Sequence, residues 1–181
     1  MKKLFILVIV IVAVFFGFSL YKKSVTQECK LTIAPTISKP DIANGTFNFE
    51  GEDIKLKDGR AITKISPDSA ITIETILTDK IEYGDVNGDK KNDSLALVIQ
   101  EGGGSGTFVY LIAYVSGNVE YKGSNAVFVG DRISPESLSI SESGVITVRY
   151  LDRLPEEPMA ADPSVSTVKT FRFVKDTLEE R

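Results

Sequence analysis

The sequence predicts a mostly β protein, with an antiparallel sandwich or barrel-like domain that follows an N-terminal hydrophobic helix. After residue 45, short β-branched or aromatic runs alternate with breaks of Gly, Asn, Asp and Pro, which is typical of antiparallel sheets. No helical period longer than ten residues follows the first segment. The 181 residues, 43% of them hydrophobic, suit one domain with a real core and a short appendage. An α+β fold is the alternative, because residues 71–77 also fit a short helix.

Residues 1–23 are predicted to be a membrane anchor or a signal peptide. The run from Leu4 to Leu20 carries no charge, and a lysine pair flanks it on each side. As a helix it reaches about 26 Å, close to a hydrocarbon core of about 30 Å. The length of this run and the absence of an A-x-A site favour an uncleaved anchor over a cleaved signal peptide. We therefore expect a single-pass protein of the cell membrane with residues 24–181 outside the cytoplasm, or a secreted protein if the signal is cleaved.

The amino-acid composition argues against several kinds of partner and catalytic site. Beyond residue 23 the chain has 17 basic and 25 acidic side chains, a net charge near −8, which argues against a nucleic-acid partner. Its one cysteine, Cys29, can form no internal disulfide, and Thr26-Gln27-Glu28 before it differs from a lipoprotein cleavage motif. The sequence contains no histidine, so Ser-His-Asp and Cys-His catalysis and His-ligated zinc are excluded.

Residues 24–44 are predicted to be a tether, and residues 45–181 a β-rich extracytoplasmic domain. The first two predicted strands, 47–50 and 54–57, form a hairpin. Each further strand is a short apolar run between turn residues: 70–77, 80–83, 94–100, 107–115, 126–129, 138–141, 145–151 and 165–174. The strand at 107–115 is apolar on both faces, and residues 95–99 of the strand 94–100 are continuously apolar, so both strands are expected at the centre of a sheet.

The segment GDVNGDKKND, residues 84–93, predicts a calcium site at the start of the strand 94–100. Its oxygen ligands alternate along the loop: Asp85, Asn87, Asp89, the backbone carbonyl of Lys91, and Asp93. Calcium takes roughly six to eight oxygens, and a tight loop can supply them in this way. An EF-hand would need glutamate where Ala96 stands, so Asp93 must close the site. The alternative is a polar turn whose side chains bond its own backbone.

This D-x-N-x-D-x-x-x-D arrangement resembles the calcium loops of integrin-type (FG-GAP) repeats and dockerin-type modules. Such loops usually have glycine at the sixth position, where Lys90 stands, and a non-glycine residue at positive φ costs about 1 kcal/mol there. With four other stretches the loop also resembles an uncharacterised family of exported bacterial proteins, often lipoproteins. Those stretches are FNFEGEDIKLKDG (47–59), GGGSGTFVYLIAY (102–114, containing GGSGTF), GDRISPESLSI (130–140) and LDRLPEEPMAADPS (151–164, containing EPM). The resemblance spans about residues 44–174 and implies a shared extracytoplasmic domain without a catalytic assignment.

The remaining motifs have mainly structural interpretations. The glycine run 102–106 is predicted to be a flexible hairpin loop, or alternatively a loop whose amides face an anion. The couples Asp131-Arg132 and Asp152-Arg153 are expected to brace loops through guanidinium hydrogen bonds.

We therefore expect a membrane-tethered calcium-binding domain that acts as a non-enzymatic binding module of the cell envelope. Its partners would be the cytoplasmic membrane, through the N-terminal helix, and a protein or glycan ligand. The alternative is a hydrolase, or hydrolase accessory, that acts on cell-wall or extracellular polymer through carboxylates. A pocket that gathers Glu101, Arg132 and Arg153 would favour this alternative.

Overall fold

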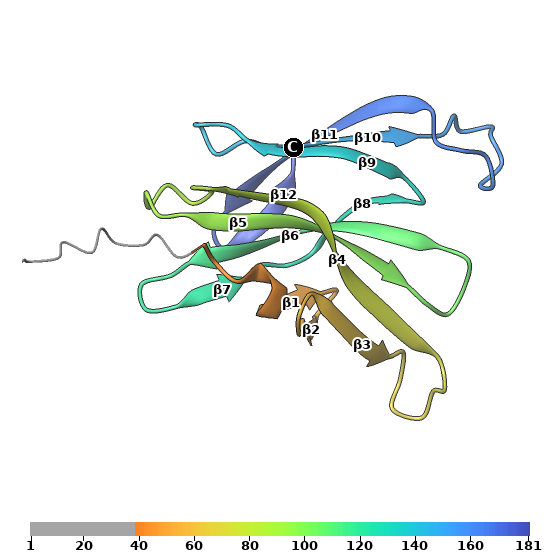
Figure 1. Cartoon of the computed structure of the whole chain (residues 1–181), viewed down its shortest axis with the longest axis horizontal. Helices are drawn as coiled ribbons and strands as arrows, with labels where there is room; N and C mark the ends of the chain where they lie inside the picture. Colours follow the sequence, from red (N-terminus) through yellow and green to blue (C-terminus); the bar gives the residue numbers. More distant parts are fainter. Residues whose placement is uncertain (1–38) are drawn as a thin grey trace, which may run out of the picture. The chain divides into compact units, whose positions relative to one another are not determined.

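Three layers of antiparallel β-structure make up residues 39–181, the part of the chain that this computed structural model describes. The middle layer in Figure 1 is a six-stranded sheet, the sheet β9–β12 packs on one face, and the hairpin β1–β2 packs on the other. The predicted antiparallel sandwich is therefore confirmed. The α+β alternative is wrong, because residues 72–77 belong to a strand and the helical element of the described chain is the short turn η1 (Ile42–Asn44).

The strands pair as follows. The central sheet has the order β3 (Arg60–Lys64), β4 (Thr72–Gly84), β5 (Asp93–Glu101), β6 (Thr107–Ser116) and β7 (Tyr121–Gly123), and β8 (Val127–Asp131) also pairs with β6. The second sheet has the order β12 (Thr177–Glu180), β11 (Val165–Val174), β10 (Ile146–Asp152) and β9 (Ser134–Ile140). The hairpin consists of β1 (Thr46–Phe49) and β2 (Glu52–Lys55).

β5 and β6 are the centre of the molecule, as their apolar composition predicts. Side chains alternate between the two faces of a strand. Leu95 and Leu97 therefore pack into the cluster under the second sheet, whereas Ala96 and Val98 pack into the cluster under the hairpin. All four side chains are fully buried, so β5 is covered on both faces.

Several elements differ from the sequence prediction. The runs 70–77 and 80–83 form one strand, β4, which continues across an irregularity between Leu77 and Ile81. β3, β7 and β12 were not foreseen, because short strands contribute little pattern of their own. The folded part also begins before residue 45, since Ile42 is only 2% exposed and packs with Phe47.

The hairpin β1–β2 is fixed to the central sheet by both side chains and backbone. Phe47 is buried and contacts the ring of Tyr114 edge-on, with centroids 6.0 Å apart. The backbone of Asn48 accepts a hydrogen bond from the Ala126 amide and donates one to the Ser124 carbonyl. A Cβ at Gly123 would fall on the carbonyl oxygen of Thr46, so this close approach requires glycine.

The predicted membrane segment, residues 1–23, and the tether as far as residue 38 lie outside the described residues. Within residues 39–181, no helix is long and apolar enough to cross a membrane.

Candidate metal loop and the adjoining groove

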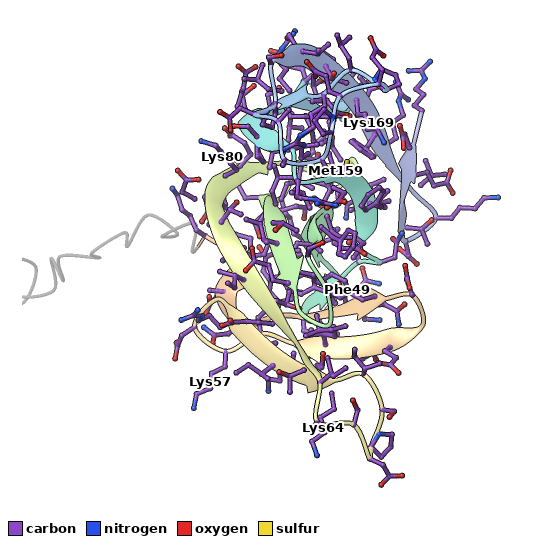
Figure 2. All side chains as sticks on the ribbon, turned by 90° about the vertical axis from the view of Figure 1, so that its right-hand side faces the viewer. Phe49, Lys57, Lys64, Lys80, Met159 and Lys169 are labelled. Atoms are coloured by element: carbon purple, nitrogen blue, oxygen red, sulfur yellow. The ribbon has the colours of Figure 1, made fainter. Side chains whose placement is uncertain are left out.

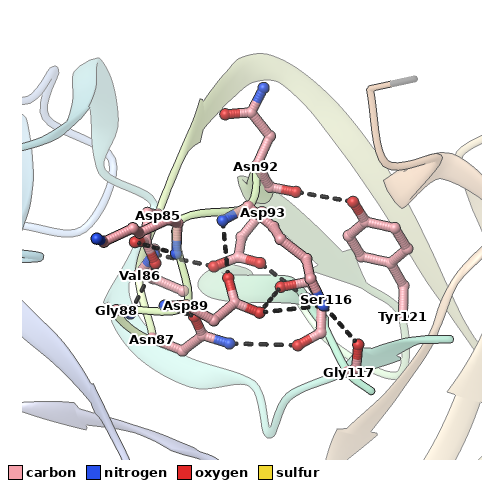
Figure 3. A network of polar contacts seen from close by, with 12 residues as sticks. Asp85, Val86, Asn87, Gly88, Asp89, Asn92, Asp93, Ser116, Gly117 and Tyr121 are labelled. Carbon is pink, nitrogen blue, oxygen red and sulfur yellow. Dashed lines mark hydrogen bonds and ion pairs between the residues drawn. The ribbon is translucent and has the colours of Figure 1, made fainter. Parts of the chain in front are cut away.

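The loop 84–93 connects β4 to β5, and its side chains bond its own backbone (Figure 3). Asp85 accepts hydrogen bonds from the amides of Gly88, at 2.6 Å, and Lys90, at 2.8 Å. Asn87 accepts from the Asp89 amide, and Asp89 accepts from the Lys91 amide. Such local bonds are a typical use of Asp and Asn in turns, so they hold the loop in one conformation.

Asp93 has a different role from the other loop carboxylates. It is fully buried, and its two oxygens accept hydrogen bonds from the Val86 amide, at 2.9 Å, and from the Ser116 amide, at 2.8 Å. A buried carboxylate is stable only when its oxygens are satisfied, and here two backbone amides do this. Asp93 therefore connects the loop to the end of β6.

The turn after β6 returns to this loop, as the hairpin geometry predicts. Ser116 donates its hydroxyl hydrogen to Asp89 Oδ2 at 2.6 Å, and its carbonyl oxygen accepts a bond from Asn87 at 3.2 Å. Lys91 Nζ donates to the Gly117 carbonyl at 3.1 Å and lies 3.6 Å from Asp89 Oδ2. The sequence predicts that the strand returning from the glycine run brings Ser116 to this end of the domain, but it does not identify the Ser116 hydroxyl as a partner of Asp89.

The Ser116 hydroxyl is also the main cause of a lowered pKa at Asp89, below the ordinary value of 3.8. Hydrogen bonds from the Lys91 amide and from Asn87, and the charge of Lys91, act in the same direction, whereas burial opposes them. Asp89 is thus an anionic acceptor at neutral pH.

The backbone of the loop turns at its fourth position, Gly88, and at its sixth, where Lys90 stands in place of the glycine expected for a calcium loop. Lys90 has φ 66° and Gly88 has φ 84°, so both residues are left-handed. The carboxylates do not converge, however: among residues 39–181 no group of three or more Asp, Glu or Cys side chains is placed to hold a metal ion. Asp85, Asp89 and Asp93 share the loop, but their oxygens face amides and the Ser116 hydroxyl.

A groove of about 670 Å³ adjoins the loop. Asn87 and Asp89 form one wall, residues between 115 and 123 form another, and Phe173 of β11 and Asp176 of the β11–β12 turn complete it. Its charged side chains are Asp89, Glu120, Lys122 and Asp176. The groove thus brings together three segments that are far apart in the sequence.

The other sequence candidates lie at the opposite end of β5. The glycine run forms the predicted hairpin loop between β5 and β6. Glu101 accepts a hydrogen bond from the Thr107 hydroxyl, and Asp131 accepts one from the Thr107 amide. These acidic groups therefore hold the end of the hairpin.

Both arginines of the Asp-Arg couples brace loops. Arg132 forms a bidentate pair with its neighbour Asp131, with a shortest distance of 2.8 Å between Nη2 and Oδ2. Arg153 donates instead to the carbonyls of Arg132, at 2.6 Å, and Ala161, at 2.5 Å. Neither of the two cavities described for residues 39–181 is lined by Glu101, Arg132 or Arg153.

Asp131 should make the stability depend on pH below about 4. Hydrogen bonds from the Arg132 guanidinium are the largest cause that lowers the pKa of Asp131 below 3.8. The Thr107 amide and the charges of Arg132 and Arg153 lower this pKa further, whereas burial raises it. The unfolded chain then binds more protons, so the stabilisation is complete above pH 3.8 and disappears as the pH falls through the lower folded value. Urea unfolding from pH 7 to pH 2.5 should show that acid lowers the free energy of unfolding less in Asp131→Asn than in the parent.

The control for this experiment is Asp68→Asn, in the exposed β3–β4 loop, which should leave the parent's profile unchanged. If acid lowers the free energy of unfolding equally in the parent and in Asp131→Asn, Asp131 is not a source of the pH dependence.

No protein-family model, curated protein or solved structure matched this chain in comparisons with known proteins. The resemblances to calcium loops and to the exported bacterial family therefore stay predictions from the sequence.

Proposed function

We propose that this chain is a membrane-tethered, extracytoplasmic β domain, with a structural calcium ion in the loop 84–93, that serves the cell envelope as a non-enzymatic binding module. The observation that carries the proposal is the conformation of the loop. Lys90 takes the left-handed turn that glycine usually provides, and Asp93 fixes the end of the loop from inside the core. A strained φ at a non-glycine residue persists only where the surroundings determine it.

The donor chemistry of the loop suits a hard cation. Each carboxylate oxygen that accepts one N–H retains a second acceptor site, so the bonds to the backbone do not consume its capacity to bind calcium. Asp89 is exposed and Asp85 is half-buried, whereas Asp93 is held in place on both oxygens. We infer that calcium binding rotates Asp85 and Asp89 toward the fixed end of the loop at Asp93. Asn87 and the Lys91 carbonyl would complete the ligand set.

The roles of the other charged residues support a binding module over a hydrolase. The guanidinium groups of Arg132 and Arg153 and the carboxylate of Glu101 make structural hydrogen bonds. They do not line either described cavity. The N-terminal apolar run and the acidic composition after it support a place outside the cytoplasmic membrane, with no nucleic-acid partner.

Calcium should stabilise the full chain against heat. With a dissociation constant of about 0.1 mM, as extracellular modules have, about 10 mM calcium adds about 2.7 kcal/mol to the free energy of unfolding. This corresponds to a rise of roughly 5 to 10 °C in the melting temperature. Thermal unfolding followed by circular dichroism, with calcium and with EDTA, measures the difference, and magnesium should give less.

Two variants control this experiment. The double substitution Asp85→Asn and Asp89→Asn should abolish the calcium shift, whereas Lys90→Gly should retain it, because glycine adopts without strain the positive φ that Lys90 already has. An equal melting temperature of the parent in calcium and EDTA would overturn the calcium proposal.

A further inference from the structure

A second cavity, of about 260 Å³, lies between the hairpin β1–β2 and strands β3 to β6. Phe49 and Ile54 of the hairpin form one side, while Ile73, Gln100 and Tyr110 belong to the central sheet. Figure 2 shows Phe49 between the hairpin and the sheet, and Lys64 near the protruding β3–β4 loop. Gln100 is seven residues along β5 from Asp93, about 23 Å at roughly 3.3 Å per residue, so this cleft is separate from the metal loop.

The cleft contains polar groups that the protein leaves without partners. Gln100 is only 9% exposed; its Nε2 donates to Thr75 Oγ1 at 3.1 Å, and its Oε1 accepts no hydrogen bond from residues 39–181. The Tyr110 hydroxyl has no hydrogen-bond partner in the same part of the chain. Burial, and then the charge of Glu50, raises the pKa of Tyr110, so its phenol is a protonated donor. Both residues line the cleft, and both groups stay open to water, because the buried side-chain polar atom without a partner in residues 39–181 is Ser94 Oγ. They are therefore available to bond a ligand in the cleft.

A strip of aromatic rings continues from the cleft across the surface. The Phe49 and Tyr110 centroids are 5.5 Å apart, and Tyr110 and Phe128 are 5.6 Å apart. Phe108 follows 6.4 Å from Phe128, and these two rings are 37% and 45% exposed, respectively. The electron-rich face of an exposed ring attracts weakly positive C–H groups, such as those on one face of a sugar ring.

We propose that the cleft and the aromatic strip bind a neutral polysaccharide, with the acetamido group of an N-acetylated sugar in the cleft. Gln100 Oε1 accepts the acetamido N–H, and the methyl group packs against Phe49, Ile54 and Ile73. The Tyr110 hydroxyl donates to a sugar oxygen, and Phe128 carries the next ring.

Charge and chemistry support this choice of ligand. The charged residues at the cleft are Glu50, Glu52 and Lys64, a net negative rim that disfavours an anionic ligand. Apolar walls beside a single amide acceptor suit an acetamido group better than a cluster of hydroxyls, which would lose hydration against isoleucine. This inference deepens the proposed function: it rests on the envelope-binding role, but not on calcium.

Isothermal titration calorimetry of the full chain with chitotetraose, the tetramer of N-acetylglucosamine, tests the proposal. Saturable binding is expected in both EDTA and calcium. Gln100→Met should weaken it about tenfold, and Phe128→Ala should weaken it several-fold. The matched control is Tyr114→Phe, on the same face of β6 but outside the cleft, which should bind like the parent. Cellotetraose, which lacks acetamido groups, should bind about tenfold more weakly than chitotetraose.

Several results would overturn the inference. These are no saturable heat at millimolar chitotetraose, equal affinity for cellotetraose, or unchanged affinity in Gln100→Met. Binding of a cell-wall stem peptide in place of the saccharide would also overturn it. If Gln100→Met does not fold, unchanged binding in Phe128→Ala, at an exposed position, is decisive against the proposal. Binding in EDTA without a calcium effect on melting would overturn the calcium proposal alone, whereas a calcium shift without saccharide binding would overturn this inference alone.

Discussion

Replacement of Asp93 by alanine is expected to lower the free energy of unfolding by about 3 to 5 kcal/mol, even in EDTA. The substitution leaves the amides of Val86 and Ser116 without their acceptor, at a position with no exposure to water. Each buried donor without a partner costs about 1 to 3 kcal/mol, and the lost carboxylate leaves a cavity as well. Urea unfolding of the full chain in EDTA measures the change without any contribution from a bound ion.

Two companion variants separate this role from that of a metal ligand. Asp93→Asn keeps one acceptor oxygen, so it should lower the free energy of unfolding about half as much as Asp93→Ala does. Asp85→Ala removes a partly exposed carboxylate that bonds only the loop backbone, and it should cost about 1 kcal/mol in EDTA. Similar losses for Asp85→Ala and Asp93→Ala would show that Asp93 does not connect the loop to the core.

Phe47→Ala is expected to cost about 3 to 5 kcal/mol, because the substitution empties a buried aromatic site between the hairpin β1–β2 and the central sheet. The ring is 1% exposed and contacts Tyr114 edge-on. Its loss should loosen the hairpin first, since β1 and β2 form a separate two-stranded sheet, and β1 is joined to the residues after β7 by the isolated bridge between Asn48 and Asn125. Hydrogen exchange should therefore accelerate at the amides of β1 and β2 before those of β5.

Phe128→Ala is the matched control, because this ring is 45% exposed and leaves no closed cavity when it is removed. Its expected cost is under about 1.5 kcal/mol, from lost aromatic contacts alone. Equal destabilisation by the two substitutions, or uniform exchange across all strands in Phe47→Ala, would contradict the assigned role of the hairpin.

Local patterns predicted the central strands well, because the interior selects apolar residues on both faces of β5 and β6. The same approach divided β4 in two, because Thr78-Asp79 interrupts the apolar pattern between the predicted strands 70–77 and 80–83. In the structure the strand continues through this irregularity, where the Thr78 hydroxyl bonds the Leu97 carbonyl at 2.8 Å. A contact between residues nineteen positions apart cannot be found in a local window. The short strands β3 and β12 depend in the same way on their neighbours.

The candidate metal loop was predictable only in part. Spacing in the sequence was enough to identify Asp85, Asn87, Asp89 and Asp93 as alternating oxygen donors, because loop positions are local. It gave no means to separate Asp93 from the others, since burial depends on where β6 returns. The predicted hairpin placed Ser116 near this loop, but its bonds to Asp89 and Asp93 depend on the register of β5 and β6.

By itself, the sequence determined the β-rich fold class, the two central strands and the candidate ligands of one loop, because alternation, turn residues and spacing are properties of neighbouring positions. Tertiary structure alone decided that Asp93 is a buried cross-link, that the Arg153 guanidinium bonds the carbonyls of Arg132 and Ala161, and that Gln100 faces a cleft beside an aromatic strip. These features depend on contacts between distant segments. Burial determines how much free energy a polar group costs when it has no hydrogen-bond partner. The burial of a residue depends on the whole fold rather than on any short stretch of sequence.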